Sequence, residues 1–496
     1  MLGRLGLALV PVKCQSMAYP WGQMARQPFL GITLDASLRA PLQAQLSAAL
    51  KQLIERGALK GGAALPSSRE LSAHLRISRN TALGALDRLI GEGYVEARQR
   101  SGLFVVPFDR GGKVRTTSLA AAPGRASGAL TTLSAPLPFR PSQPDVRLFP
   151  IAQWNRMRTR ALKRYGTQLF CYQTSHTLGL PALRQRVAEY LRDSRGVRCH
   201  WEQVAITSGS QQALYAVAQL LLARGDRVLM EDPGYPGAQA AWRGAGARIV
   251  PGAVDHHGLV IPRSGRTPRL VYLTPSRQFP TGACMPVSRR VDVLEYARRD
   301  GSWIVEDDYD SEFRYSSAPV PSLQGLDRSD RVIYVGSMSK VLIPALRIGY
   351  VVLPQGLVEP FTALRAMLDD FGPFVDQATL AEFMESGALF TQIRRCRREY
   401  GLRLATLLAE SQRLGLPLRF PHVDGGMNLM GLPTEPLPPD LEFRLRRAGL
   451  DLPLLGSFAE RFVQPGLLFG FAAFNQQEIV AGVARVATAL RERQRA

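Results

Sequence analysis

The chain has 496 residues, of which 46% are hydrophobic and 21% are charged, and its formal net charge is +21. This length is more than one hydrophobic core usually serves, so we expect at least two units. The composition excludes a disordered chain, a fibrous repeat and a polytopic membrane protein. The excess of positive charge suggests a polyanionic partner, of which nucleic acid is the commonest.

The cysteines and the apolar runs indicate in which compartment the protein is located. The five cysteines are far apart and form no C-x-x-C pair, which excludes a disulfide framework and a zinc site, so we expect no bound metal and a cytoplasmic location. Residues 1–27 are expected to be disordered or over-annotated, with Met17 or Met24 as the initiator. The longest mainly apolar run, residues 213–223, is about half of the ~20 residues that a membrane span needs, so no span is predicted.

Residues 28–107 are predicted to form a first, mainly helical unit. A first helix carries one apolar face and ends at Gly57; its apolar residues are Leu42, Leu46, Leu50, Leu53 and Ile54. Ser67 and Glu70 form a capping box at the start of a second helix. Ser78 caps a third helix, and we expect the following apolar residues of that helix to face inward: Leu83, Leu86, Leu89 and Ile90.

The second and third of these helices, joined by a tight turn, predict a helix-turn-helix. The exposed start of the third helix carries two hydroxyls, a guanidinium and an amide, which belong to Ser78 and Thr81, to Arg79 and to Asn80. Such groups can contact base edges and phosphates from the major groove. A two-stranded hairpin then turns near Ser101 and Gly102, with Arg98 and Arg100 beside the turn. On geometry alone, a small helical domain with solvated arginines is the alternative.

The stretches LPSSREL, SRNT, EGY and SGLFV stand in the order and spacing of the GntR-type winged helix, over about residues 41–106. The resemblance implies that this unit binds a double-stranded DNA operator. It also implies the residues that contact DNA, which are Arg69, Ser78, Arg79, Asn80 and Thr81 at the helices, with Arg98 and Arg100 at the wing.

A linker and a larger unit are predicted beyond this domain. Residues 108–137 are rich in small residues, Gly and Pro and have no apolar period, which is typical of a flexible linker. In residues 138–496, strand-like runs alternate with helical segments. Such alternation predicts βαβ units and a largely parallel sheet. The clearest runs are residues 227–231, 269–274, 302–307, 331–336 and 348–353.

Two stretches of the larger unit carry groups that suit an anionic, nitrogen-containing ligand. Gly209, Ser210 and Gln211 lie at a strand-to-helix turn, where free N–H groups and the helix dipole attract a phosphate, although an ordinary turn has the same pattern. Residues 306–308, Glu-Asp-Asp, end a buried strand. Three carboxylates there are costly unless a cation or a pyridinium nitrogen lies beside them.

Lys340 follows another strand, with Ser337 and Ser339 before it and Arg347 after it. A lysine among cationic or apolar neighbours can lose its proton and form a Schiff base. Two hydroxyls and a guanidinium nearby suit a phosphate. A single loop lysine is usually only solvated, but the lysine, the carboxylates and the phosphate turn together favour a cofactor site.

These parts resemble a fold-type I pyridoxal-phosphate domain of the aminotransferase kind, and its fusion to a winged helix resembles the MocR subfamily of GntR-type transcription regulators. The implied fold is an α+β winged helix-turn-helix followed by an α/β aminotransferase-like domain. Lys340 would hold pyridoxal 5'-phosphate as a Schiff base, Asp307 rather than Glu306 would pair with the pyridinium nitrogen, Tyr309 would bond to the phenolic oxygen and Tyr235 would stack on the ring. The phosphate would be bound by Gly209, Ser210, Gln211, Ser337, Ser339 and Arg347.

The sequence departs from the aminotransferase pattern at several positions. Leu468 stands where an arginine usually binds the substrate α-carboxylate, and a leucine has no group for that contact. Phe279 replaces the usual asparagine before Pro-Thr-Gly, and Arg277 and Asn428 stand where other residues are expected. The resemblance therefore implies a homodimeric regulator that senses pyridoxal phosphate or an amine or amino-acid effector through Lys340, with at most partial transamination.

Two alternatives remain open at this point. One is an active aminotransferase with an accessory DNA-binding module, in which Arg243, Arg277 or Arg314 replaces the missing arginine. The other is a structural DNA-binding protein with an inactive pocket.

Overall fold

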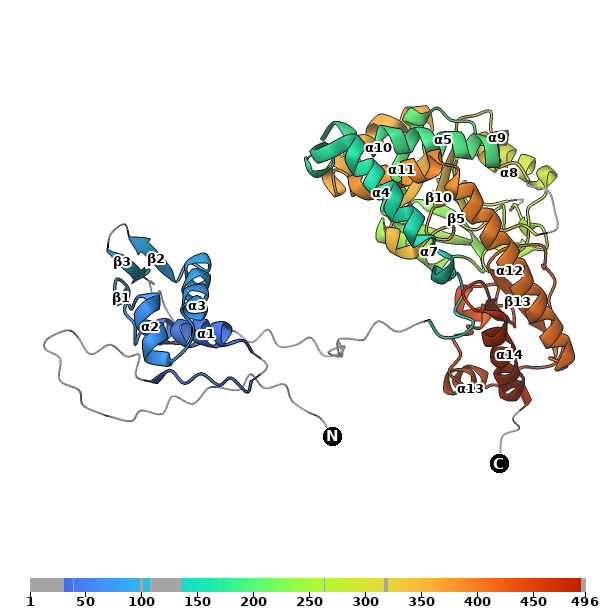
Figure 1. Cartoon of the computed structure of the whole chain (residues 1–496). Helices are drawn as coiled ribbons and strands as arrows, with labels where there is room; N and C mark the ends of the chain where they lie inside the picture. Colours follow the sequence, from blue (N-terminus) through green and yellow to red (C-terminus); the bar gives the residue numbers. More distant parts are fainter. Residues whose placement is uncertain are drawn as a thin grey trace, which may run out of the picture. The chain divides into compact units, whose positions relative to one another are not determined.

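The computed structural model describes residues 31–98 without 39, residues 101–107, and residues 136–491 without 173, 263 and 316–319. It divides into two compact units, Met1–Leu130 and Thr131–Ala496 (Figure 1). Arg100, the N-terminal segment 1–27 and most of the predicted linker lie outside the described residues. No helix in the described ranges is both long enough and apolar enough to cross a membrane.

The smaller unit is a three-helix domain with a small sheet. Its helices are α1 (Leu42–Glu55), α2 (Ser68–Leu75) and α3 (Arg79–Gly91). Its strands, in the order β1-β3-β2, are β1 (Ala64–Leu65), β2 (Val95–Arg98) and β3 (Gly102–Val105). The predicted hairpin is β2 and β3, and the short β1, which pairs with β3, was not predicted.

Both predicted helix caps are present. The Ser67 backbone N–H donates to Glu70 Oε2 at 2.7 Å, and the Ser67 hydroxyl accepts from the Glu70 N–H, which completes the capping box of α2. Ser78 Oγ accepts from the Thr81 N–H at 3.0 Å at the start of α3. Each cap satisfies backbone donors that the first helical turn leaves unpaired.

The prediction for the inner face of α3 was partly wrong. Leu86 and Leu89 are buried, but Leu83 and Ile90 are 47% and 37% exposed, and the small residues Ala82 and Ala85 are buried instead. The reason is a close approach of α3 to α1. A Cβ atom on Gly84 would lie 2.5 Å from the Gln43 side chain of α1, so only a small-residue face of α3 fits there.

The larger unit is built on an eight-stranded mixed sheet of order β4-β11-β10-β9-β8-β5-β6-β7. The neighbours from β10 through β6 are parallel, whereas β4, β11 and β7 pair in the antiparallel sense. All five predicted strands are present. The bounds are β4 (Val204–Thr207), β5 (Arg227–Asp232), β6 (Arg248–Asp255), β7 (Gly258–Leu259), β8 (Leu270–Leu273), β9 (Trp303–Asp308), β10 (Val332–Ser337) and β11 (Gly349–Val352).

Helices cover both faces of this sheet. On one face, α6, α7 and α10 pack over Ile333 and Val335; on the other, α5, α11 and α12 pack over Tyr334, because neighbouring side chains of a strand alternate. A second sheet, β12-β13-β14, lies in the C-terminal part with α13 and α14 (Figure 1). The bounds are α4 (Ile151–Tyr165), α5 (Pro181–Arg195), α6 (Ser210–Leu221), α7 (Pro236–Gly244), α8 (Val287–Asp300), α9 (Leu323–Leu326), α10 (Val358–Leu368), α11 (Phe374–Glu385), α12 (Ala388–Arg413), α13 (Leu441–Arg447), α14 (Gln476–Arg491), β12 (Leu418–Arg419), β13 (Asn428–Pro433) and β14 (Leu467–Gly470).

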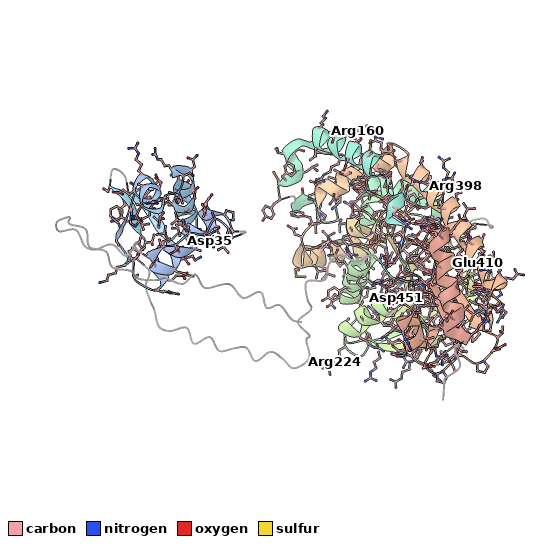
Figure 2. The ribbon with its side chains drawn as sticks, turned by 60° about the horizontal axis from the view of Figure 1, so that its bottom comes forward. Asp35, Arg160, Arg224, Arg398, Glu410 and Asp451 are labelled. Carbon is pink, nitrogen blue, oxygen red and sulfur yellow. The ribbon has the colours of Figure 1, made fainter. Side chains whose placement is uncertain are left out.

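Positive charge occurs on several elements of the larger unit. Exposed arginines occur on separate elements, for example Arg160 on α4, Arg224 after α6 and Arg398 on α12 (Figure 2). About half of the net charge of +21 lies on the first 150 residues of the sequence. The charge density therefore favours the N-terminal side of the chain as the part that meets a polyanion.

Candidate functional site

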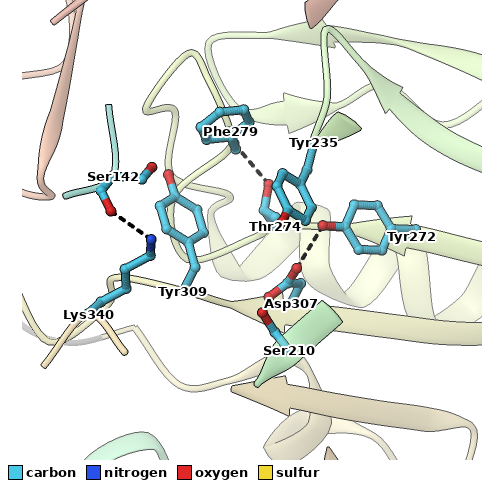
Figure 3. Close-up of a pocket in the computed structure, with 9 residues that line it drawn as sticks. All are labelled: Ser142, Ser210, Tyr235, Tyr272, Thr274, Phe279, Asp307, Tyr309 and Lys340. Atoms are coloured by element: carbon cyan, nitrogen blue, oxygen red, sulfur yellow. Dashed lines mark hydrogen bonds between the residues drawn. The ribbon is translucent and has the colours of Figure 1, made fainter. Parts of the chain in front are cut away.

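A cavity of about 120 Å³ lies at the carboxyl ends of the parallel strands of the larger unit. This edge is where α/β proteins usually bind their ligands. Strand β8 contributes Tyr272, β9 contributes Asp307, and the loops that follow β8, β9 and β10 contribute further side chains (Figure 3). The nine lining residues are Ser142, Ser210, Tyr235, Tyr272, Thr274, Phe279, Asp307, Tyr309 and Lys340.

Lys340 enters the cavity from the loop after β10. Its amine Nζ donates to the backbone carbonyl of Ser142 at 2.7 Å (Figure 3). Burial lowers the pKa of Lys340, although the charges of Asp310 and Asp307 oppose that shift. A lowered pKa increases the fraction of neutral amine, which is the nucleophilic form.

Asp307 is buried on the opposite wall. It accepts a hydrogen bond from the Tyr272 hydroxyl at 2.7 Å. Burial raises the pKa of Asp307 to about 6; the neighbouring charge of Asp308 adds to this effect, whereas Tyr272 and Lys340 oppose it. A cationic group placed beside this carboxylate would therefore gain from pairing with it.

The three acidic residues of β9 do not form one cluster. Glu306 accepts from the backbone N–H groups of Leu323 and Gln324 at 2.9 and 2.8 Å. Asp308 pairs with Arg195, with 2.8 Å between Oδ2 and Nε. Of the three acids only Asp307 lines the cavity, because the side chains of a strand alternate between its faces.

The predicted phosphate ligands lie around the start of α6 and the end of β10. Ser210 lines the cavity. A Cβ atom on Gly209, whose φ is +91°, would lie 3.1 Å from Arg347 Nη2, so glycine lets this guanidinium approach the turn. Arg347 also donates to the Ser208 carbonyl at 2.7 Å.

The other three predicted ligands have contacts of their own. The Gln211 side chain donates to the Gly237 carbonyl and lies 3.3 Å from the Tyr235 hydroxyl. Ser337 Oγ accepts from the Ser339 N–H at 3.1 Å, in the same loop as Lys340.

Ser142, Tyr272 and Thr274 line the cavity but were not predicted. The position of Tyr272 in β8, one strand from Asp307 in the parallel sheet, is a signal that would have found it. No sequence signal points to Ser142. Its backbone N–H donates to Asn428 Oδ1 at 2.6 Å, and Asn428 Nδ2 donates to Ser142 Oγ at 3.1 Å.

A second candidate site lies on the smaller unit, at the start of α3. Arg79 and Asn80 are exposed there, and Arg69 is exposed on α2. The hydroxyls of Ser78 and Thr81 lie 2.7 Å apart and take part in the helix cap.

In β2, Arg98 pairs with Glu96 at 2.8 Å and lies over the Phe104 ring. Among the described residues predicted to contact DNA, Arg69, Arg79 and Asn80 are exposed, whereas Ser78, Thr81 and Arg98 have partners inside the domain.

Comparisons with known proteins match both units. The family model of bacterial regulatory proteins of the gntR family matches residues 42–105, and that of class I and II aminotransferases matches residues 157–396. The probable rhizopine catabolism regulatory protein MocR of Rhizobium meliloti is 36% identical over 466 residues, which cover 91% of this chain and 94% of that protein. The HTH-type transcriptional regulator YdeL of Bacillus subtilis is 34% identical over 93% of this chain and 98% of its own.

Solved structures match the larger unit. The crystal structure of LysN, the alpha-aminoadipate aminotransferase of Thermus thermophilus in complex with N-(5'-phosphopyridoxyl)-L-leucine, superposes with a TM-score of 0.65 at 30% identity. The match covers 72% of this chain and 92% of that one. The chain, which joins a GntR winged helix to an aminotransferase fold and aligns with MocR along nearly its full length, belongs to the MocR subfamily of GntR-type transcription regulators.

Proposed function

We propose that this regulator binds pyridoxal 5'-phosphate in the cavity of the larger unit and that the state of Lys340 controls its binding to operator DNA. One observation carries the proposal: a partly buried lysine, a buried carboxylate and two tyrosines line the same cavity. These residues are Lys340, Asp307, Tyr235 and Tyr309. Ser210, the first residue of α6, also lines this cavity.

The residues present fit this cofactor. Asp307, with its raised pKa, suits a pyridinium nitrogen, which would hold the carboxylate in its charged form. The first turn of α6, with Gly209 and Arg347 beside it, suits a phosphate dianion. Ser337 and Ser339 offer hydroxyls from the Lys340 loop, and Gln211 offers its backbone N–H. When bound, the cofactor supplies a carbonyl carbon that forms reversible Schiff bases with amines.

Transmission of a signal requires that two states of the protein make different contacts. As a free amine, Lys340 donates a hydrogen bond to the Ser142 carbonyl. A covalent bond from the Lys340 nitrogen to the cofactor would leave that nitrogen with fewer N–H groups, so its hydrogen bond to the Ser142 carbonyl would weaken. Ser142 lies near the start of the described part of the larger unit, so a change in this contact would act on the segment with which that part begins.

DNA recognition is assigned to the smaller unit. We propose that Arg79 and Asn80 read base edges in the major groove, that Ser78, Thr81 and Arg69 contact phosphates, and that Arg98 contacts the backbone as a wing residue. Arg100 belongs to the same proposed wing. A homodimer, with two winged helices on two half-sites, and a cytoplasmic location complete the proposal.

The test uses the full chain and the DNA that flanks its own gene. Pyridoxal phosphate is titrated while the visible absorbance of the Schiff base and the fluorescence anisotropy of labelled DNA are recorded. We expect the absorbance to appear and the DNA affinity to change together. Lys340→Ala should abolish both responses, whereas Lys163→Ala, at an exposed lysine of α4, should abolish neither. Unchanged DNA affinity at saturating cofactor contradicts the proposal.

A further inference from the structure

An apolar cluster forms the wall of the cavity beside Phe279. The Phe279 ring lies edge-on to two cavity tyrosines, with centroid distances of 6.0 Å to Tyr235 and 5.9 Å to Tyr309. Five further apolar side chains belong to the same cluster without lining the cavity, which are Met430, Leu432, Leu455, Phe458 and Leu468. Met430 and Leu468 face each other across β13 and β14.

The two strongest departures from the aminotransferase pattern meet in this cluster. Phe279 is 8% exposed and Leu468 is fully buried, and both belong to the same group of contacting side chains although they are far apart in sequence. Apolar side chains therefore stand at both positions, with Phe279 in the cavity lining and Leu468 in the cluster packed against it.

Neither Arg277 nor Arg314, two arginines that could replace the missing charge, is among the described residues that line the cavity. Arg277 is buried, donates to the Asn428 carbonyl, and lies 3.8 Å from Asp310 and 3.6 Å from Asp424. Arg314 pairs with Asp424 at 3.2 Å.

Arg243 pairs with Glu460 outside the cavity. Among the described residues that line the cavity, the only ones that can carry a charge near neutral pH are Asp307 and Lys340.

This wall favours one class of ligand. A carboxylate pressed against it would lose its water without gaining a cation or a hydrogen-bond donor, which is strongly unfavourable. An alkyl or aryl group in the same place would gain from apolar contact with Phe279 and Tyr309.

We infer that the effector is a primary amine with an uncharged apolar substituent and no carboxylate on the carbon that bears the nitrogen. The inference rests on the proposed cofactor site, because the amine would exchange with Lys340. In that exchange the ligand nitrogen would form a C=N bond to the cofactor carbon, the C=N bond to Lys340 would break, and two protons would pass from the ligand amine to Lys340 Nζ, which is released as a free amine. Nothing is oxidised or reduced.

The experiment compares two pairs of ligands that differ only by the carboxylate: 2-phenylethylamine with phenylalanine, and pentylamine with norleucine. Each is titrated into the full chain loaded with pyridoxal phosphate, and binding is followed by visible circular dichroism and by thermal stabilisation. We expect each amine to bind at least about tenfold more tightly than its amino acid. Equal affinity, tighter binding of the amino acids, or no binding of either amine overturns the inference.

A double variant tests the wall directly. Phe279→Asn with Leu468→Arg should reverse the preference toward the amino acids, whereas the matched apolar change Leu468→Met should keep it. If the buried arginine prevents folding, the wild-type ligand pairs still decide the question. Failure of the cofactor site itself is recognised separately, since the Schiff-base absorbance would then be absent before any amine is added.

Discussion

The amine of Lys340 donates a hydrogen bond to the carbonyl of Ser142, 2.7 Å away and 198 residues earlier in the chain. Ser142 and Phe139 both adopt positive φ values, +59° and +67°, which are unfavourable for residues with a side chain. Such conformations persist only where the surroundings hold them. Here Asn428 holds Ser142, and the Phe139 carbonyl accepts from the Gly470 N–H of β14 at 2.9 Å. The segment that follows the linker is thus held in a strained conformation by contacts that reach the cavity.

Asn428→Ala should loosen this segment. The Ser142 N–H and hydroxyl would lose their partner, at a cost of about 1–3 kcal/mol in the free energy of unfolding of the larger unit. The response of DNA affinity to pyridoxal phosphate should also decrease, because Ser142 would no longer be held in one position. Chemical denaturation and anisotropy titrations measure the two effects. Asn155→Ala, at an exposed asparagine of α4, is the control, and an equal effect of both variants would contradict the role of Asn428.

Arg79→Ala should weaken operator binding by about 1–3 kcal/mol, since its guanidinium stands exposed at the start of α3 where a major-groove contact is expected. Anisotropy titrations at several salt concentrations also distinguish a base contact from a phosphate contact. Only the loss of a phosphate contact lowers the slope of log affinity against log salt concentration, by about one unit. The matched control is Arg88→Ala at the other end of α3, where the arginine pairs with Glu92 at 2.8 Å. A similar loss of operator affinity in both variants would show a general effect of positive charge and would contradict base recognition by the start of α3. Cofactor absorbance should stay unchanged in both variants.

Ser67→Ala should destabilise α2 by about 1 kcal/mol, because it removes the acceptor that the Glu70 N–H uses in the capping box. Hydrogen exchange of the α2 amides, followed by mass spectrometry on the full chain, measures this loss locally. Ser72→Ala changes a serine within the same helix whose hydroxyl only donates to the Arg69 carbonyl, so it should have little effect. Faster exchange in Ser72→Ala than in Ser67→Ala would contradict the importance of the cap.

Local sequence signals predicted the elements and much of the candidate site. The caps at Ser67 and Ser78 and the five strand-like runs are short-range patterns, so each is readable from the neighbouring residues. The choice of Asp307 over Glu306 was a judgement against the usual aminotransferase spacing, which places the acid three residues before the tyrosine. The alternation of β9 supplies a reason for it, since Asp307 lines the cavity and Glu306 accepts hydrogen bonds at the start of α9. The features that could be predicted are therefore those determined by residues close together in the sequence.

The missed features depend on contacts between distant segments. Leu83 and Ile90 are as apolar as Leu86, and only the approach of α1 to Gly84 decides which face of α3 is buried. Ser142 has no distinctive neighbours, and its importance comes from Lys340 and Asn428, which are far away in the chain. The apolar cluster that contains Phe279 and Leu468 likewise required the strands β13 and β14 to be placed beside the loop after β8.

Asp307 should make the cofactor-free protein less stable as the pH rises. Burial raises its pKa from the ordinary value of 3.8 to about 6 in the folded state, so the folded protein holds this proton more tightly than the unfolded chain does. The stability that this proton contributes is fully present below about pH 4 and is lost as the pH rises through about 6. Asp307→Asn keeps the acceptor for Tyr272 and carries no charge, so it should stabilise the cofactor-free protein at pH 8 by on the order of 3 kcal/mol and have little effect at pH 4.

Denaturant unfolding of the cofactor-free chain at pH 4, 6 and 8 measures this difference. Asp292→Asn, at an exposed aspartate of α8, is the control and should show no such dependence on pH. Pyridoxal phosphate should reverse the order at pH 8, because a pyridinium beside Asp307 would stabilise the charged carboxylate that the asparagine lacks. A gain from Asp307→Asn that is the same at every pH would show that the burial of this carboxylate is not the cause.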